Sequence, residues 1–483
     1  MLFNSTQFLI FFPVVTILYF ILPHKIRWFL LLVSSCIFYM AFVPKYILIL
    51  GFTIVIDYLA GIFIDKLKGN NKRIFLIISI LSNVGILFVF KYFNFFNGNV
   101  ARLANMLDWN YPISSLSIIL PIGLSFHTFQ SMSYIIEVYR GKEKPEKHFG
   151  IYALYVMYYP QLVAGPIERP QNMLWQFHKE HKFDVKRTSD GLKLIAWGFF
   201  KKLVIADNLA LVVNAAYKSP NSLSGLSLLV ATYFFAFQIY CDFSGYTDIA
   251  RGASRIMGIE LMENFKRPYL AKTVSEFWKR WHISLTSWFT DYVYISLGGN
   301  RCAKWKWYKN TLIVFLLSGL WHGAAWTYVI WGGLNGFYLV FAIWTKGVRQ
   351  KISHTCRIDR VPIISKSVKI FVTFNLICLS WIFFRATSFR SALSIIKKII
   401  TDFSLQMNFG DVGITRYQIV LCCCIILLLL VVQLLQRSQC LSDVISKKPL
   451  VLRWGLYYVF IFLIIIFGVY DVVDKSPFIY FQF

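Results

Sequence analysis

The sequence predicts an all-α polytopic integral membrane protein, because its composition is too apolar and too weakly charged for a soluble domain. Of the 483 residues, 57% are hydrophobic, 18% are aromatic and only 15% are charged, and the mean hydropathy is +0.57. Soluble domains are about 45–50% apolar and about 25% charged. The excess apolar surface is therefore expected to face lipid.

Apolar stretches of the length needed to cross a bilayer, about 20 residues, recur along the whole chain. They are Phe8–Leu22, Trp28–Val43, Tyr46–Ile64, Ile74–Phe93, Leu116–Ile136, Leu226–Tyr240, Thr311–Trp344, Ile370–Phe384, Ile419–Leu435 and Leu456–Tyr470. Thr311–Trp344 is long enough for two spans hinged at its glycines. We therefore expect roughly eleven spans in a single integral domain, residues 1–483. Met1–Gln7 contains no Lys or Arg, so the first span is expected to be retained rather than cleaved as a signal peptide.

The net charge of +27 is explained by membrane topology and does not indicate nucleic-acid binding. Basic residues follow alternate spans, as the positive-inside rule predicts for cytoplasmic turns. These residues are Lys25 and Arg27, then Lys66, Lys68, Lys72 and Arg73, then Arg140, Lys142, Lys144 and Lys147. The turn 94–111 carries a single Arg and is expected outside, whereas the basic segments 252–309 and 346–369 are expected inside. Lys447, Lys448 and Arg453 precede the last span. Both chain termini are therefore expected on the outer face, opposite a basic inner face that attracts an anionic donor.

The nine cysteines show no pattern typical of a metal or disulfide framework. No CxxC pair occurs, and no histidine cluster has the spacing of a zinc site. We therefore predict no metal and no permanently bound cofactor.

Two segments interrupt the succession of spans. Residues 158–170 contain three prolines, which exclude a regular helix and favour a re-entrant or interfacial element on the inner side. Residues 274–289 are predicted to form one amphipathic helix in the headgroup plane, with Trp278, Trp281, Leu285 and Trp288 on one face. His282 lies beside that face.

His322 is the residue most indicative of chemistry, since an ionisable group inside a span is costly and is functional by default. It lies in the sequence Leu-Leu-Ser-Gly-Leu-Trp-His-Gly-Ala-Ala-Trp, residues 316–326, where small residues allow close helix packing or a cavity. A neutral imidazole can act as a general base near pH 7. A histidine that only hydrogen-bonds a neighbouring span fits the residues equally well.

Four blocks of sequence resemble the membrane-bound O-acyltransferase superfamily, most closely its bacterial alginate O-acetyltransferase branch. These are Tyr-Cys-Asp-Phe-Ser-Gly-Tyr-Thr-Asp (240–248), Glu-Asn-Phe-Lys-Arg-Pro-Tyr (263–269), Glu-Phe-Trp-Lys-Arg-Trp-His-Ile-Ser-Leu (276–285) and Leu-Trp-His-Gly-Ala-Ala-Trp (320–326). They lie in a signature core, residues 238–336, and weaker similarity extends over nearly the whole chain.

The resemblance implies a ring of helices around a central pore in a bacterial inner membrane. It implies that His322 is catalytic and that His282 is the second signature residue. Acetyl-coenzyme A, or an acyl carrier protein thioester, is the implied donor, with Arg267, Lys279, Arg280 and Trp278 expected to contact it. An extracytoplasmic SGNH-type acetyltransferase is the implied partner, which would deliver the acyl group to a polysaccharide.

Several polar and aromatic residues can be given roles in acyl transfer. The developing oxyanion needs donors, for which Trp321, Trp326 and the backbone N–H groups near Gly323 are candidates. Asp242 and Asp248 are six residues apart and do not share a helix face. We therefore expect structural ion pairs instead of a carboxylate dyad. Their expected partners are Arg251, Arg255 or Lys266.

The last residues, Phe-Ile-Tyr-Phe-Gln-Phe (478–483), resemble the F-x-Y-x-x-F motif of the small partner protein in teichoic-acid D-alanylation. There the tyrosine is thought to carry the acyl group. We expect the tail 474–483 to fold into an outer cavity, where Tyr480 accepts the acyl group with His322 as base. The plainer interpretation is an aromatic anchor at the outer membrane interface.

Two alternative functions remain at this point. A polytopic transporter or flippase would explain the spans, the broken segments and the buried charges, although not the ordered sequence blocks. An acyltransferase that acts on a lipid or a teichoic-acid-type acceptor would keep the chemistry and change only the acceptor.

Overall fold

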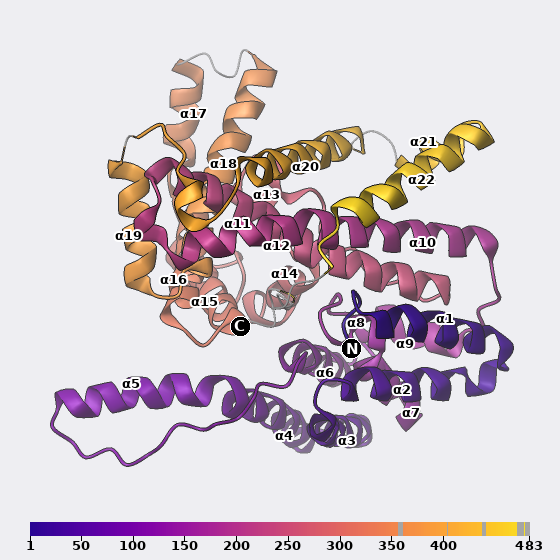
Figure 1. Ribbon diagram of the computed structural model, residues 1–483. Helices are drawn as coiled ribbons and strands as arrows, with labels where there is room; N and C mark the ends of the chain where they lie inside the picture. The colour runs from indigo at the N-terminus through magenta and orange to yellow at the C-terminus, as the bar shows by residue number, and fades with distance from the viewer. Residues whose placement is uncertain (356–360, 403, 437–440, 471–477, 479–483) are drawn as a thin grey trace. The chain divides into compact units, whose positions relative to one another are not determined.

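The structure is a computed structural model that describes residues 1–355, 361–402, 404–436, 441–470 and 478, and all of its regular elements are helices. The described chain forms two compact units (Figure 1). Unit 1 comprises residues 1–195 and 246–262, and unit 2 comprises residues 196–245 and 263–483. Two of the three boundaries fall inside long helices, α10 (Val185–Phe199) and α12 (Gly225–Ile256), and the third follows Met262.

Unit 1 contains the first part of the chain. Its helices are α1 (Thr6–Ile21), α2 (His24–Met40), η1 (Pro44–Tyr46), α3 (Ile47–Lys66), α4 (Asn70–Leu87), η2 (Phe88–Tyr92), α5 (Phe93–Met106), α6 (Leu124–Tyr139), α7 (Phe149–Met157), α8 (Tyr159–Leu162) and α9 (Pro170–His178). α8 is buried along its whole length, and α7 is buried from Gly150 to Met157. The segment 158–170 is not a continuous helix, as its prolines predicted.

Unit 2 contains three of the four blocks that resemble acyltransferases, and the block 240–248 as far as Gly245. Its helices include η3 (Phe200–Ala206), α11 (Asp207–Lys218), η4 (Pro220–Ser222), η5 (Pro268–Leu270), α13 (Val274–Trp278), α14 (Ile283–Phe289), η6 (Thr290–Tyr294), α15 (Lys304–His322), α16 (Trp326–Trp344) and α17 (Lys346–Thr355). They continue with α18 (Pro362–Arg385), α19 (Phe389–Thr401), η8 (Phe409–Val412), α20 (Arg416–Leu435), α21 (Leu441–Ser446) and α22 (Leu450–Phe467).

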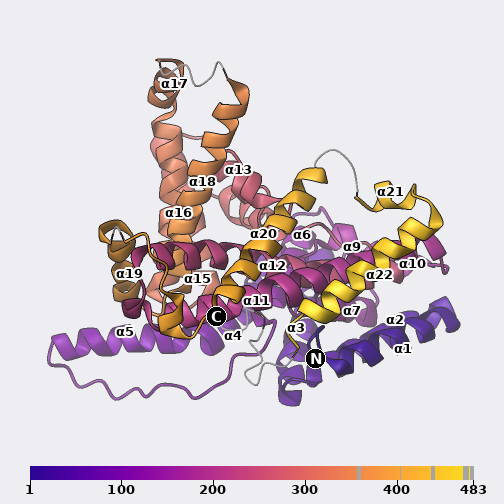
Figure 2. The ribbon, with the colours of Figure 1, turned by 45° about the horizontal axis from the view of Figure 1, so that its top comes forward.

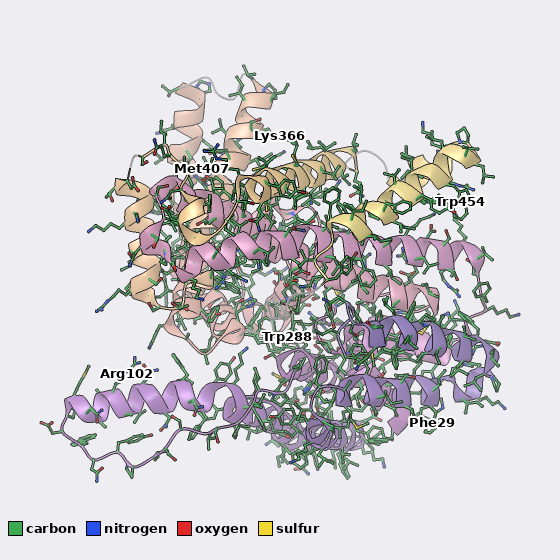
Figure 3. The ribbon with its side chains drawn as sticks, in the orientation of Figure 1. Phe29, Arg102, Trp288, Lys366, Met407 and Trp454 are labelled. Carbon is green, nitrogen blue, oxygen red and sulfur yellow. The ribbon has the colours of Figure 1, made fainter. Side chains whose placement is uncertain are left out.

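Seven helical stretches of the described chain are long and apolar enough to cross a membrane. They are Pro44–Lys66, Asn70–Met106, Gly225–Ile256, Trp326–Trp344, Pro362–Arg385, Arg416–Leu435 and Leu450–Phe467. α22 buries none of its side chains, and Trp454 on this helix is 50% exposed (Figure 3). Such an apolar, unburied helix is stable only when lipid surrounds it. The count of eleven spans stays a prediction.

Two predicted boundaries in unit 1 are wrong. The expected span 116–136 begins only at Leu124, because Pro121 lacks a backbone N–H and Gly123 adopts a left-handed φ of 77°. The expected outer turn 94–111 is largely helical, since α5 continues to Met106. The segment 107–116 returns along α5 (Figure 1), where the Asn94 side chain exchanges two 2.8 Å hydrogen bonds with the backbone of Leu116.

The stretch 311–344 forms a helical hairpin of α15 and α16 that breaks at Gly323–Ala325, as its glycines predicted. Small residues allow the two helices to approach closely. A Cβ atom added at Gly319 would lie 2.3 Å from the Tyr328 carbonyl oxygen, and one at Gly332 would lie 2.2 Å from the Phe315 carbonyl oxygen. α18 packs against α16, and both views show these two helices side by side (Figure 2). The close approach fixes His322 at the end of α15.

Candidate active site

His322 is the last residue of α15 and lies in a box of aromatic rings. Its side chain is 4% exposed. The ring centroids of Trp331 and Phe384 lie 4.9 and 5.4 Å from that of His322, and Trp321 lies at 4.7 Å. The box excludes water from the imidazole, which strengthens electrostatic interactions with any bound reactant.

The chain turns away from α15 at Gly323 because the ring of Tyr328 occupies the space where a side chain would lie. A Cβ atom at position 323 would lie 2.2 Å from that ring. Tyr328 in turn contacts Phe384 at 5.1 Å. Glycine is therefore required here by packing, and it allows the helix to end directly after the histidine.

His282 lies in a break between two short helices, which corrects the prediction of one continuous helix over 274–289. α13 ends at Trp278 and α14 begins at Ile283. His282 has a left-handed φ of 43°, a conformation that helices of L-residues cannot contain. The apolar face that was expected to lie at the headgroups is instead buried inside unit 2. Its residues Trp278, Trp281, Leu285 and Trp288 are at most 7% exposed. Trp281, for example, packs against Tyr269 and Trp381.

Asn264, which sequence reasoning missed, holds the His282 turn in place. Its Oδ1 atom lies 3.3 Å from His282 Nδ1 and accepts 3.0 Å hydrogen bonds from the backbone N–H and the hydroxyl of Ser284. Its carbonyl oxygen accepts the N–H of Ile283 at 2.9 Å. Burial lowers the pKa of His282 to about 3, so the ring is neutral at physiological pH. Asn264 lies in the block 263–269, but nothing in its spacing marked it as a partner of His282.

A single ring, Trp321, lies between the two histidines. Its centroid is 4.7 Å from that of His322 and 6.1 Å from that of His282. The structure therefore brings the two predicted catalytic histidines into one aromatic cluster. Trp331 and Phe384 complete this cluster and were not among the predicted site residues, although Trp331 follows His322 closely in the sequence.

The predicted donor-binding residues lie around the same turn. Trp278 is buried, with its ring 5.7 Å from that of Trp331. Arg267 also has a left-handed φ, 48°, and its carbonyl oxygen accepts a 3.4 Å hydrogen bond from Arg280. Arg280 also pairs with Glu276 at 2.6 Å. Lys279 is exposed. The two arginines are therefore joined, and their donor-binding role stays a prediction.

The aspartates form structural ion pairs, and one of the pairs was not foreseen. Asp248 pairs with Arg251 at 3.4 Å, as predicted. Asp242 pairs with Lys202 at 2.6 Å, and Lys202 also contacts Asp207 at 2.9 Å. This buried triad was missed because Lys202 lies forty residues earlier in the chain.

The tail is described at one position. Phe478 is 2% exposed, and its ring lies 5.6 Å from that of Phe243. Phe243 in turn lies 4.7 Å from the ring of His282. Tyr480 lies outside the described residues.

Fold and site together define a membrane enzyme with a buried histidine pair, and sequence comparison identifies its class. Residues 147–384 match the model of the MBOAT, membrane-bound O-acyltransferase family. The chain belongs to this family. It is therefore a multi-pass membrane O-acyltransferase, which favours the enzyme over the transporter or flippase.

Three relatives illustrate the range of the family. The chain is 36% identical over 396 residues to a probable alginate O-acetylase of Pseudomonas aeruginosa, covering 81% of this chain and 73% of that protein. It is 35% identical over 435 residues to a peptidoglycan O-acetyltransferase of Helicobacter pylori, covering 83% and 80%. It is 31% identical over 289 residues to a teichoic acid D-alanyltransferase of Bacillus subtilis, covering 56% and 69%.

A charge placed beside His282 is expected to make activity depend on pH. In Asn264→Asp, a carboxylate near His282 Nδ1 would raise the pKa of the ring, since an opposite charge favours the protonated form. Below the raised pKa the ring would be cationic and transfer would be slow; above it, transfer would recover. The ratio of variant to wild-type rate is therefore expected to rise with pH. Asn264→Leu, which adds no charge, should give a ratio independent of pH, and equal profiles for the two variants would contradict a role for neutral His282.

Proposed function

We propose that this protein moves an acetyl group from a cytoplasmic thioester donor across the membrane, through His322 and Tyr480, toward an extracytoplasmic polysaccharide. The observation that carries the proposal is the burial of Phe478 against Phe243, next to His282. The α-carbons of residues two positions apart are separated by at most about 7 Å. Phe478, two residues before Tyr480 in the sequence, therefore packs against a ring that itself contacts His282.

The chemistry is a general-base-catalysed acyl transfer. The Tyr480 hydroxyl attacks the thioester carbonyl carbon, a C–O ester bond forms and the C–S bond breaks. His322 takes the phenolic proton and returns it to the departing thiolate, so that the free thiol leaves. A phenol with a pKa of about 10 needs such a base near neutral pH. The water-excluded box around His322 limits hydrolysis of the thioester.

In this scheme, His282 positions the donor. It is neutral and held by Asn264, and it lies in the same turn as Arg280 and Trp278. Arg267 and Arg280 could meet an anionic donor, either coenzyme A or an acyl carrier protein. Both donors end in the same thioester, so the histidine chemistry is shared.

The acceptor is proposed from the kinship with enzymes named for acetylation of alginate and peptidoglycan. The tyrosyl ester would be handed to an SGNH-type acetyltransferase outside the membrane, which releases the phenol and esterifies a sugar hydroxyl. An aryl ester is activated enough for this second step, because its leaving group is far more acidic than an alcohol. Transfer to a teichoic-acid-type acceptor is the variant suggested by the D-alanyltransferase relative.

Mass spectrometry of the C-terminal peptide tests the proposal. The reconstituted protein, incubated with acetyl-coenzyme A or acetylated carrier protein, is expected to show an acetyl group on Tyr480, and Tyr480→Phe is expected to show none and to lose transfer to polymer. Tyr458→Phe serves as the matched control, because Tyr458 is exposed on α22. A fully active Tyr480→Phe protein would exclude the carrier role.

A further inference from the structure

The helix that runs from Val185 to Lys218 is interrupted by a π-helix, η3. All seven residues of η3 are buried. π-Helical turns inside α-helices are rare and occur frequently at functional sites, because the extra residue disturbs the regular hydrogen-bond ladder. The helix-interior carbonyl groups displaced in this way can accept other donors.

Two carbonyl groups of η3 accept donors from outside the regular ladder. The Leu203 carbonyl oxygen accepts the backbone N–H of Val469 at 3.1 Å. The Val204 carbonyl oxygen accepts the side-chain amide of Asn208 at 2.9 Å. The same Asn208 amide donates to the carbonyl oxygen of Phe467 at 2.9 Å. Phe467 is the last residue of α22, so these bonds fix the end of the helix that precedes the C-terminal tail.

Ring contacts reinforce this attachment. Phe460 on α22 lies 5.2 Å from Phe200 and 6.2 Å from Trp197, measured between ring centroids. Among the elements of the described chain, η3 is the one that α22 contacts most. The end of α22 therefore depends on η3 and Asn208 for its position.

η3 is itself fixed to the part of α12 that contacts the histidine cluster. Lys202 pairs with Asp242, and Lys201 donates a 3.0 Å hydrogen bond to the Ser244 hydroxyl. Phe243, between these two residues of α12, contacts both Phe478 and His282. Val469 and Phe478 are therefore both connected to residues 242–244 of α12, Val469 through η3 and Phe478 directly through Phe243.

We propose that η3 and Asn208 form a tail anchor, which fixes the start of the C-terminal tail so that Tyr480 is presented to the histidines as an intramolecular acceptor. This inference rests on the proposed role of Tyr480. Anchoring one end of a short tether raises the effective concentration of the group that it carries. Asn208 is a positioning residue here, since it contacts neither the donor nor the reacting atoms.

Asn208→Leu tests the anchor because leucine keeps the branching at Cγ and removes both hydrogen bonds of the amide. Single-turnover acetylation of Tyr480 is expected to slow about tenfold, the effect of losing one to two hydrogen bonds. The Val469 amide is expected to lose protection in hydrogen exchange followed by mass spectrometry. Asn375→Leu, on α18, is the matched control, because it also removes two hydrogen bonds of an amide: one donated to the carbonyl four residues earlier at 2.9 Å and one accepted from the Tyr233 hydroxyl at 2.6 Å. It should leave both measurements unchanged.

A second measurement separates anchoring from a general structural role. In the Tyr480→Phe background, a synthetic peptide of residues 470–483 is offered in trans as acceptor. In this background, Asn208→Leu should release the protein's own tail and speed acetylation of the added peptide. In the protein that retains Tyr480, the same substitution should slow acetylation of Tyr480 itself. A loss of both reactions would mean that Asn208 only supports the fold and would overturn the proposal, as would unchanged Val469 protection.

Failure of the proposed function is recognised separately. If wild-type protein carries no acetyl group on Tyr480, the proposed role of Tyr480 as acyl carrier is excluded without any anchor variant. Val469 exchange then still decides whether η3 and Asn208 hold the tail. An unprotected Val469 amide in the wild-type protein would refute the anchor, whatever the chemistry of Tyr480.

Discussion

His322→Gln is expected to reduce acyl transfer by about a hundredfold to ten-thousandfold, the contribution of a positioned general base. Glutamine has a similar volume and keeps hydrogen-bonding capacity, so the aromatic box of Trp331 and Phe384 should remain packed. It cannot exchange a proton near neutral pH. The measurement is transfer from labelled acetyl donor by purified protein in vesicles, with unfolding midpoints recorded in parallel.

The chain contains a matched control for this substitution. His127 on α6 is also a buried histidine, 2% exposed, and it lies outside the candidate site. His127→Gln is expected to retain most of the activity. Comparable losses in the two variants would show that any buried histidine is needed for the fold, and the assignment of His322 as base would be withdrawn.

Lys202→Met is expected to be the most destabilising single change in unit 2, by about 3–5 kcal/mol, the cost of leaving buried charges without their partner. Asp207 and Asp242 would face one another without the ammonium group that now lies 2.9 and 2.6 Å from them. The penalty comes chiefly from the desolvated carboxylates and not from the loss of attraction. Chemical unfolding of the detergent-solubilised protein measures it.

Two further variants make this prediction specific. Lys193→Met removes a lysine from a half-exposed pair with Asp190 on α10, and is expected to cost at most about 1 kcal/mol. Lys202→Met combined with Asp207→Asn and Asp242→Asn should recover much of the loss, because no buried charge then lacks a partner. A triple variant as unstable as Lys202→Met would show that packing, and not charge, dominates at this position.

The sequence was sufficient for features that depend on hydrophobicity. Spans such as Arg416–Leu435 and Pro362–Arg385 correspond to predicted stretches, because twenty apolar residues have few other stable environments. The break between α15 and α16 was predicted from glycines that the close helix contact requires. Boundaries that depend on one residue, such as Gly123 at the start of α6, were missed because apolar residues continue on both sides.

The two histidines of the candidate site were predicted from the sequence, whereas its geometry and several of the residues around them were not. His282 and His322 were singled out, yet the turn at His282 depends on Asn264, eighteen residues earlier in the chain, and no local pattern encodes that contact. η3 has no compositional signature, since its residues would also fit an α-helix. Lys202 was not singled out from the sequence, whereas its burial beside Asp242 makes it structural. Long-range contacts decide each of these cases.

The main-chain conformation at His282 has a consequence that does not depend on what its ring touches. For a residue other than glycine, the left-handed backbone conformation costs about 1–2 kcal/mol relative to the right-handed one. Stability alone would therefore favour glycine at positions 282 and 267, where φ is 43° and 48°. Histidine and arginine occupy these positions instead, which lowers the stability of the folded protein. Such local strain concentrates where side chains act on a ligand, so the backbone conformation supports the proposed roles of both residues independently of sequence resemblance.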